Sequence, residues 1–201
     1  INEKWECKMA GILGLTTTAL NFLGVTLELH EDGKVIMHQK KYILSKLNKR
    51  GLLQGKGKWT LPVMEEGKSL PVLVKDRMYH RMLKKCQEEI GTLMWLGKKT
   101  RPDIMTSVSV SASMQTKDPS RTLEFVEGIW KYLAMTWNEV AVIESNKDEE
   151  WRLKITTDAS HAPGGDRSRS GVVILLGGVV LHWHSGKQGL TAMSTCESEI
   201  E

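Results

Sequence analysis

The chain has 201 residues, of which 40% are hydrophobic and 26% are charged, a composition typical of a folded globular protein. No apolar run approaches the ~20 residues of a membrane helix, and the first residues lack the features of a signal peptide, so we expect no membrane association. The formal net charge is a modest +4, and the three cysteines form no CxxC pair, which argues against a disulfide framework or zinc knuckle and favours a reducing, intracellular setting.

The first elements predicted along the chain are a β-hairpin and a short helix. Residues 22–39 alternate apolar and polar side chains on both sides of an Asp-Gly pair, which supplies the positive φ that a hairpin turn needs. Residues 39–51 have the spacing of an amphipathic helix that stops at Gly51. Residues 51–76 are rich in Gly, Pro and Lys and have weak periodicity, so we expect a long connection there.

Three helices are predicted next. The first covers residues 77–96 and has a single apolar stripe. The second begins at the sequence TRPD, where Pro102 and Asp103 suit a first helical turn. The third begins at KDPS, where Asp118 can cap the helix and Pro119 can occupy its first position.

The pattern changes near residue 145. The acidic, polar segment ESNKDEE reads as a linker, and we place a domain boundary near residues 145–151. The segments LKITTDA, SGVVILLGG and VVLHWHS that follow are predicted strands, with the Gly177-Gly178 pair as the turn between the last two. The predicted fold class is therefore α+β.

Charge is distributed unevenly along the sequence. Residues 1–60 hold ten Lys and Arg against five Asp and Glu, whereas residues 106–150 hold four against eight. A basic front and an acidic stretch behind it suit a polyanionic partner on one face of the molecule. Ordinary solvated charge is an equal alternative on these counts alone.

Two carboxylates are the leading candidates for chemistry. Asp158 follows a predicted strand and precedes small residues, a position typical of functional groups and also of turns. In STCESEIE, Ser194 and Glu197 match a capping box, which gives Glu197 a structural role. Glu199 lies about 200° around the helix from Glu197 and is left to meet Asp158. Such a pair suits Mg²⁺, although nucleases that use two metals normally need more than two carboxylates.

Several segments of the sequence resemble segments of a known protein family. TTDASHAPGGDRSRSGVVILLGGVVLHWHSGKQGLTAMSTCESEIE resembles the start of the ribonuclease H domain of copia-type LTR retrotransposon Pol polyproteins. NFLGVTLELHEDGKVIMHQKKYI resembles the hairpin that closes the reverse-transcriptase palm of that family. IGTLMWLGKKTRPDIMTSVSVSAS and DPSRTLEFVEGIWKYLAMT resemble the helical stretch between polymerase and nuclease. The motifs occur in one order and cover nearly the whole chain.

The resemblance implies a division of the chain and a set of site residues. Residues 1–60 would be the end of the palm and the start of the thumb, 61–145 a helical thumb and connection, and 151–201 the N-terminal part of a mixed-sheet, truncated ribonuclease H-like domain. The metal-binding and catalytic acids would be Asp158 and Glu199, with Mg²⁺ or Mn²⁺ as cofactor. Nucleic-acid contacts are expected at Phe22, Leu23, Gly24, Ser185, Lys187 and Gln188, of which the first three match the segment that steadies the primer strand.

The sequence also departs from the family pattern. Ser160 replaces the second Asp of the first nuclease motif, and His161 replaces the Trp that follows it. The paired-Asp signature of the polymerase does not occur, and the later nuclease carboxylates would lie beyond Glu201. Because the chain also begins without Met, we expect it to be a fragment that is incomplete for both activities.

Other candidates have balanced interpretations. Arg101 follows Lys98 and Lys99, and this cluster of basic residues could either contact phosphates or lie in solvent at the end of a helix. His182 and His184 share one strand face and fit surface histidines better than a metal site, since no further ligand is evident.

Three hypotheses remain for the function. The chain is a remnant of a retrotransposon reverse transcriptase and ribonuclease H that has lost activity by truncation, a non-catalytic module that binds nucleic acid through its basic front half, or a weakly folded gene fragment. The expected partners are an RNA–DNA hybrid or other nucleic acid and the rest of the Pol polyprotein. The expected location is a cytoplasmic particle or the nucleus.

Overall fold

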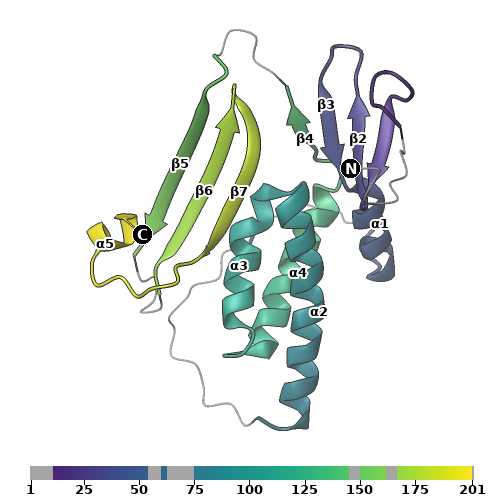
Figure 1. Cartoon of the computed structure of the whole chain (residues 1–201). Coiled ribbons are helices and arrows are strands. Elements are labelled where there is room, and N and C mark those ends of the chain that lie inside the picture. The colour runs from purple at the N-terminus through teal and green to yellow at the C-terminus, as the bar shows by residue number, and fades with distance from the viewer. Residues whose placement is uncertain (1–10, 54–59, 63–74, 145–149, 162–166, 201) are drawn as a thin grey trace, which may run out of the picture.

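The computed structural model describes residues 11–53, 60–62, 75–144, 150–161 and 167–200. Helices and antiparallel sheets are both present, so the predicted α+β class is confirmed. In Figure 1 the helices occupy the lower centre, one sheet lies above them at the upper right, and the other sheet lies along their left side. Much of the predicted 51–76 connection and of the 145–151 linker falls outside the described residues.

The first sheet has four antiparallel strands in the order β1 (Ala19–Phe22), β2 (Val25–Leu29), β3 (Val35–His38) and β4 (Ala141–Ile143). The predicted hairpin is confirmed as β2 and β3, with Gly33 at a φ of 85° in the turn. Strands β1 and β4 were not predicted. Strand β4 has only three residues, and its partner β3 precedes it by about a hundred positions, so no local pattern marks the pairing.

The helical group contains α1 (Lys40–Lys49), α2 (Arg77–Lys99), α3 (Met105–Met114) and α4 (Pro119–Met135), with a 3-10 turn η1 (Pro102–Ile104) before α3. Asp118 caps α4 by accepting a hydrogen bond of 3.0 Å from the Arg121 amide, as the sequence predicts. The buried core of this group draws on all four helices and η1 and comprises Ile43, Leu47, Cys86, Ile90, Leu93, Leu96, Ile104, Val108, Val126, Ile129, Trp130 and Leu133.

The second sheet contains the three antiparallel strands β5 (Leu153–Ser160), β6 (Arg169–Leu176) and β7 (Val179–Lys187), in that spatial order. Gly177 and Gly178 form the β6–β7 turn with φ values of 54° and 79°, which confirms the predicted turn. The short helix α5 (Thr195–Ile200) follows and contacts β5 and β6.

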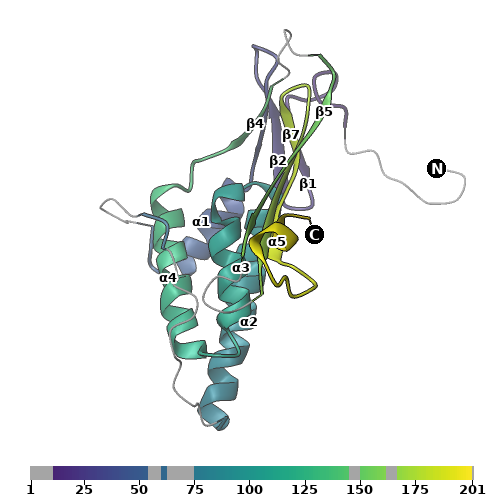
Figure 2. The same cartoon turned by 90° about the vertical axis from the view of Figure 1, so that its left-hand side faces the viewer.

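Specific polar bonds attach the second sheet to the helices. The Trp183 indole donates to the Gly97 carbonyl on α2 at 2.7 Å, and the Arg169 guanidinium donates to the hydroxyls of Ser109 and Ser113 on α3 at 2.9 and 3.0 Å. Figure 2 shows the sheet close to edge-on beside α3, with α5 lying against its lower end. The sheet face that carries Arg169 and Trp183 therefore faces the helices.

Candidate nucleic-acid interface and carboxylate cleft

Asp158 lies on the sheet face that is turned toward the helices. It pairs with Gly171 on β6, which in turn pairs with Ser185 on β7. Because side chains alternate along a strand, Asp158 shares its face with Thr156, and the register places Trp183 and Ser185 on that same face. The Asp158 carboxylate is therefore presented to the space between β5 and the start of α3.

That space is a cleft of about 290 Å³. Its sheet side includes Thr156, Asp158 and Trp183, and its helix side is formed by Pro102, Met105 and Thr106. Asp158 is the one Asp or Glu among the residues that line it. The cleft also contains the backbone or side chains of Thr157, Gly171, Val172, Val173, His184 and Ser185.

Hydroxyl groups accompany the carboxylate in this cleft. The Thr106 hydroxyl donates a hydrogen bond of 3.3 Å to the Ser185 hydroxyl, which links α3 to β7. Ser185, expected from the sequence to contact nucleic acid, is thus in the same cleft as Asp158. Thr106 was not singled out in the sequence, because its proximity to Ser185 depends on contact between elements 79 positions apart.

Helix α5 begins as the capping-box pattern predicts. The Ser194 hydroxyl accepts a hydrogen bond of 3.1 Å from the Glu197 amide, and the Glu197 carboxylate accepts one of 2.6 Å from the Met193 amide. The reciprocal bond goes to Met193 rather than to Ser194 itself. The structural role predicted for Glu197 is confirmed, and Glu199 is exposed on the same helix.

Gln188 holds α5 against the sheet. Its side-chain amide nitrogen donates to the Ser170 hydroxyl at 2.9 Å and to the Ser198 carbonyl at 2.5 Å, and the residue is 6% exposed. Ser170 is adjacent to Arg169, so its side chain lies on the opposite sheet face from Asp158. The sequence prediction placed Gln188 in a nucleic-acid contact, whereas in the structure its amide nitrogen is engaged within the protein.

The two predicted catalytic acids, Asp158 and Glu199, are therefore associated with opposite faces of the sheet. Asp158 faces the helices, while α5, which bears Glu199, is bonded through Gln188 to the other face. Within the described ranges, no group of three or more His, Cys, Asp and Glu lies close enough to hold a metal ion. Asp158 is an oxygen donor of the kind that Mg²⁺ prefers, but the described residues do not surround it with the further acids of a two-metal centre.

Phe22, Leu23 and Gly24, the expected primer-strand contacts, form the tip of the β1–β2 hairpin. Leu23 and Gly24 have φ values of 50° and 77°, the pattern of a tight hairpin turn. The side chains of Phe22 and Leu23 are 68% and 70% exposed. An apolar tip is therefore presented to solvent, far along the chain from the Asp158 cleft.

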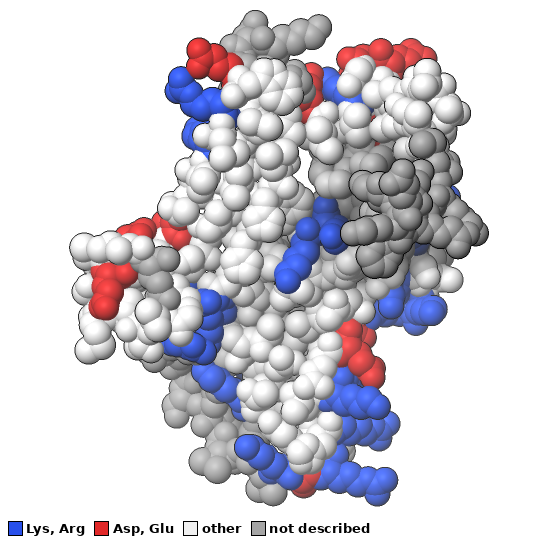
Figure 3. Space-filling view, viewed as in Figure 1, with Lys and Arg blue, Asp and Glu red and all other residues white. Residues whose placement is uncertain are grey.

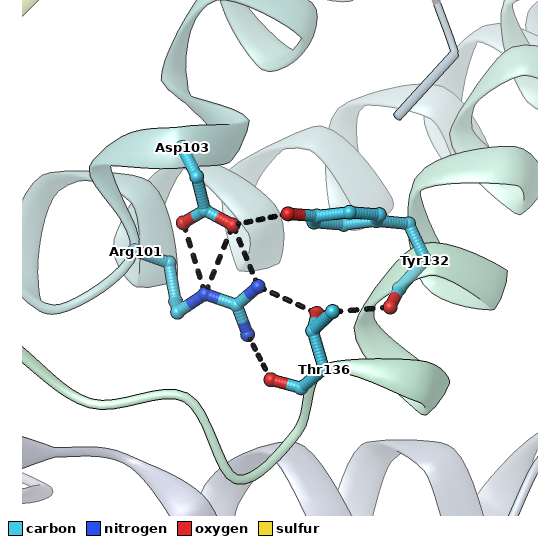
Figure 4. Close-up of polar contacts among 4 residues, drawn as sticks. All are labelled: Arg101, Asp103, Tyr132 and Thr136. Carbon is cyan, nitrogen blue, oxygen red and sulfur yellow. Dashed lines mark hydrogen bonds and ion pairs between the residues drawn. The ribbon is translucent and has the colours of Figure 1, made fainter. Parts of the chain in front are cut away.

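Arg101 has a structural environment that neither sequence interpretation anticipated. It is 2% exposed, and its guanidinium donates to Asp103 at 2.6 to 3.2 Å and to the carbonyl and hydroxyl of Thr136 at 2.7 Å each (Figure 4). Tyr132 donates its hydroxyl to Asp103 at 3.0 Å. The guanidinium joins the α2–η1 corner to the end of α4, and each of its three nitrogens donates to a protein acceptor.

This environment changes the acidity of two groups. Burial acts to raise the pKa of Asp103, but the hydrogen bonds and charge of Arg101, together with the Tyr132 hydroxyl, outweigh it and lower that pKa below its usual value of 3.8. Burial, and then the Asp103 charge, raise the pKa of the Tyr132 hydroxyl. Both shifts favour an ionised Asp103 that is paired with Arg101 at neutral pH.

An exposed basic row on α2 was missed in the sequence. Arg77, Arg81, Lys84 and Lys85 are all exposed, and their spacing of three and four places them along one side of the helix. Figure 3 shows Lys and Arg gathered over the lower part of α2. We call these four residues the α2 basic row. Their periodic spacing was the available signal; the sequence prediction counted a net charge of +3 over residues 76–105 but did not place these four cations on one side of the helix.

Comparisons with known proteins include a distant relative. The chain is 24% identical over 179 residues to a protein of Arabidopsis thaliana named uncharacterized mitochondrial protein AtMg00810, an alignment that covers 89% of this chain and 71% of the relative. No protein-family model matches the chain, and no solved structure does. Among the helices that the structure describes, none is both long and apolar enough to cross a membrane.

Proposed function

We propose that this chain is a retrotransposon-derived part of a reverse transcriptase and ribonuclease H that binds nucleic acid, RNA–DNA hybrids in particular, without completing a cleavage centre. The observation that carries the binding part is the α2 basic row, four exposed cations on one side of a long helix. Cations in such a row can contact successive phosphates, and each contact adds salt-sensitive affinity.

The order of elements supports the retrotransposon origin. A hairpin is followed by helices, then by a three-stranded antiparallel sheet whose first strand bears Asp158, and then by a helix that bears Glu199. This is the order implied by the resemblance of the sequence to copia-type Pol polyproteins. The sequence similarity to AtMg00810 extends over 89% of the chain, which supports a distant relationship along nearly its whole length.

The carboxylate cleft supports binding rather than cleavage. Asp158 could hold one hydrated Mg²⁺ or Mn²⁺ together with a substrate phosphate, since Mg²⁺ is usually bound by one or two carboxylates. Hydrolysis by two metals needs more acids than the described residues bring to this cleft. The hydroxyls of Thr106, Thr156 and Ser185 would contact sugar or phosphate oxygens beside that carboxylate.

Binding tests the proposal directly. Fluorescence anisotropy of a labelled RNA–DNA hybrid, measured over a series of salt concentrations, compares the chain with a variant in which Arg77, Arg81, Lys84 and Lys85 are all replaced by Gln. We expect the slope of log affinity against log salt to fall by about 0.7–0.9 for each cation that contacts a phosphate. Replacing four exposed cations outside α2 by Gln, namely Lys41, Lys49, Lys117 and Arg152, gives a matched loss of charge elsewhere.

The alternative is a gene fragment without a partner. In that case the chain would show weak, salt-sensitive affinity that the two sets of substitutions reduce equally, because only net charge would matter. Equal loss in both variants would therefore overturn the proposal, whereas selective loss in the α2 basic row variant would support it.

A further inference from the structure

The exposed side of α2 that carries the α2 basic row also carries a histidine. Arg77, His80, Arg81 and Lys84 follow the spacing i, i+3, i+4 and i+7, which places them along one side of the helix, and all four are exposed. His80 therefore lies among three members of the row. Histidine ordinarily changes its charge between about pH 5 and pH 8, so the charge of this surface depends on pH.

The His80 ring has a fixed neighbour on its own helix. It meets the Tyr79 ring edge to face, with the two centroids 5.4 Å apart and an angle of 84° between the ring planes. Tyr79 is 6% exposed, and its hydroxyl donates a hydrogen bond of 2.9 Å to the Thr116 carbonyl in the turn between α3 and α4. The imidazole thus rests against an anchored aromatic ring while it stays open to solvent.

The charges around His80 on α2 are mainly positive. Arg77 lies three residues before it and Lys84 four residues after it, distances at which side chains on a helix are neighbours. Asp76 lies four residues before it, and the Asp76 carboxylate accepts a hydrogen bond of 2.8 Å from the Tyr79 amide as the cap of α2.

The turn between α3 and α4 packs against the same end of α2 through the bond from Tyr79 to Thr116. Its charged residues are Lys117, which is exposed, and Asp118, whose carboxylate accepts the Arg121 amide as the cap of α4. Lys117 and Asp118 carry opposite charges, so the turn leaves the positive balance of the α2 surface unchanged.

The place of these cations at the start of α2 is unfavourable for the free helix. The macrodipole is positive at a helix N-terminus, so Arg77 and Arg81 are repelled there, and the first turn of α2 has no acidic residue. Departures from local preferences of this kind are expected at functional sites. A bound anion would reverse the repulsion, and a nucleic-acid backbone presents phosphates in a regular series.

We infer that His80 takes up a proton from solvent when the α2 basic row binds a nucleic-acid backbone, so that affinity rises as the pH falls from about 8 to about 6. A phosphate beside the ring favours the charged imidazolium, which then donates from a ring nitrogen to a phosphate oxygen. This proton uptake rests on the proposed function, because it concerns the same surface. It adds regulation by pH to that binding.

The test is a set of anisotropy titrations of a labelled RNA–DNA hybrid at pH 6 and at pH 8, each over a series of salt concentrations. For the unaltered chain, we expect the slope of log affinity against log salt to be steeper at pH 6 by up to about 0.7–0.9, the value of one phosphate contact. His80→Gln should keep the shallower slope at both pH values. His80→Arg, which is always charged, should keep the steeper slope at both.

His182→Gln is the matched control, because His182 is an exposed histidine on β7, outside the α2 surface. It should retain the full difference between pH 6 and pH 8. Circular dichroism at both pH values checks that each variant is folded, which is expected because both histidines are exposed.

The outcomes separate this inference from the proposed function. A slope that does not change with pH in the unaltered chain, or a change that His80→Gln retains or that His182→Gln also removes, would overturn proton uptake at His80 and leave the binding proposal standing. Equal loss of affinity in the α2 basic row variant and its charge-matched control would overturn both. Selective loss of the pH difference in His80→Gln, together with its loss at high affinity in His80→Arg, would support the inference.

Discussion

The indole nitrogen of Trp183 on β7 donates a hydrogen bond of 2.7 Å to the carbonyl oxygen of Gly97, near the end of α2. This bond joins the sheet that carries Asp158 to the helix that carries the α2 basic row. Gly97 is buried, and an added Cβ would lie 3.2 Å from the Met105 sulfur, so the helix surface at this point is closely covered. The relative position of the two proposed functional surfaces depends on this contact.

Replacing Trp183 with Phe should destabilise the protein. The substitution removes the indole donor and leaves the Gly97 carbonyl without this partner, which costs about 1–3 kcal/mol for a buried acceptor. Urea unfolding followed by circular dichroism measures the change. Trp137→Phe is the matched control, because Trp137 is 37% exposed, and it should alter stability by no more than about 0.5 kcal/mol. Equal effects of the two substitutions would contradict the role given to the indole bond.

Replacing Arg101 with Gln should destabilise the chain more than replacing an exposed cation does. Arg101 is buried, whereas the side chain of its partner Asp103 is 35% exposed, so we expect a cost below the about 3–5 kcal/mol of a fully buried ion pair and above the at most about 0.5 kcal/mol of a surface substitution. Thermal unfolding of Arg101→Gln and of Lys98→Gln, an exposed neighbour, makes the comparison. If Arg101→Gln unfolds like the control but binds the hybrid more weakly, Arg101 is a phosphate contact after all.

Asp103 predicts a specific dependence of stability on pH. Its pKa is lower in the folded protein than its usual value of 3.8, so its contribution to stability is complete above that value and is lost as the pH falls through the folded pKa. We expect the unaltered chain to lose stability on acidification below about pH 4 more steeply than Asp103→Asn, which has no such group to protonate. Urea midpoints measured between pH 3 and pH 7 would show parallel curves if the ion pair contributed nothing.

Cys86 and Cys196 should differ in reactivity. Burial raises the pKa of the Cys86 thiol to about 11, and the thiol donates to the Pro119 carbonyl at 3.2 Å. Cys196 is exposed. Because the thiolate is the reactive form, iodoacetamide at pH 8 should modify Cys196 in the native protein and Cys86 only after unfolding. Peptide mass spectrometry distinguishes the two, and rapid native labelling of Cys86 would contradict its buried position.

Features that depend on neighbouring residues could be predicted from the sequence. The Asp118 cap, the Gly177-Gly178 turn and the Ser194 cap each rest on a few adjacent positions, and the structure has all three. The role of Arg101 could not be predicted in this way. Its sequence neighbours Lys98 and Lys99 suggest a basic surface, but its hydrogen-bond partner Thr136 is 35 positions away, and only packing of α4 against the α2–η1 corner brings it near.

In the candidate site, too, the features that depend on adjacent residues could be predicted, and those that depend on distant segments could not. The strand that carries Asp158 and the capping role of Glu197 were both predicted from the sequence, but β5 continues to Ser160, so Asp158 lies within the strand and not after its end. The cleft itself was not, because its second wall comes from Pro102, Met105 and Thr106 on a distant segment. The attachment of α5 through Gln188 also depends on side-chain contacts that no spacing in the sequence records.

The most direct test of the central claim measures binding and cleavage of one substrate together. A hybrid with a labelled RNA strand is incubated with the chain in Mg²⁺ or Mn²⁺, its binding is followed by anisotropy, and its length is followed on a denaturing gel, with Asp158→Asn in parallel. The account predicts salt-sensitive binding by both proteins and intact RNA in both. Cleavage by the unaltered chain that disappears in Asp158→Asn would contradict it, because the chain would then complete a working nuclease centre.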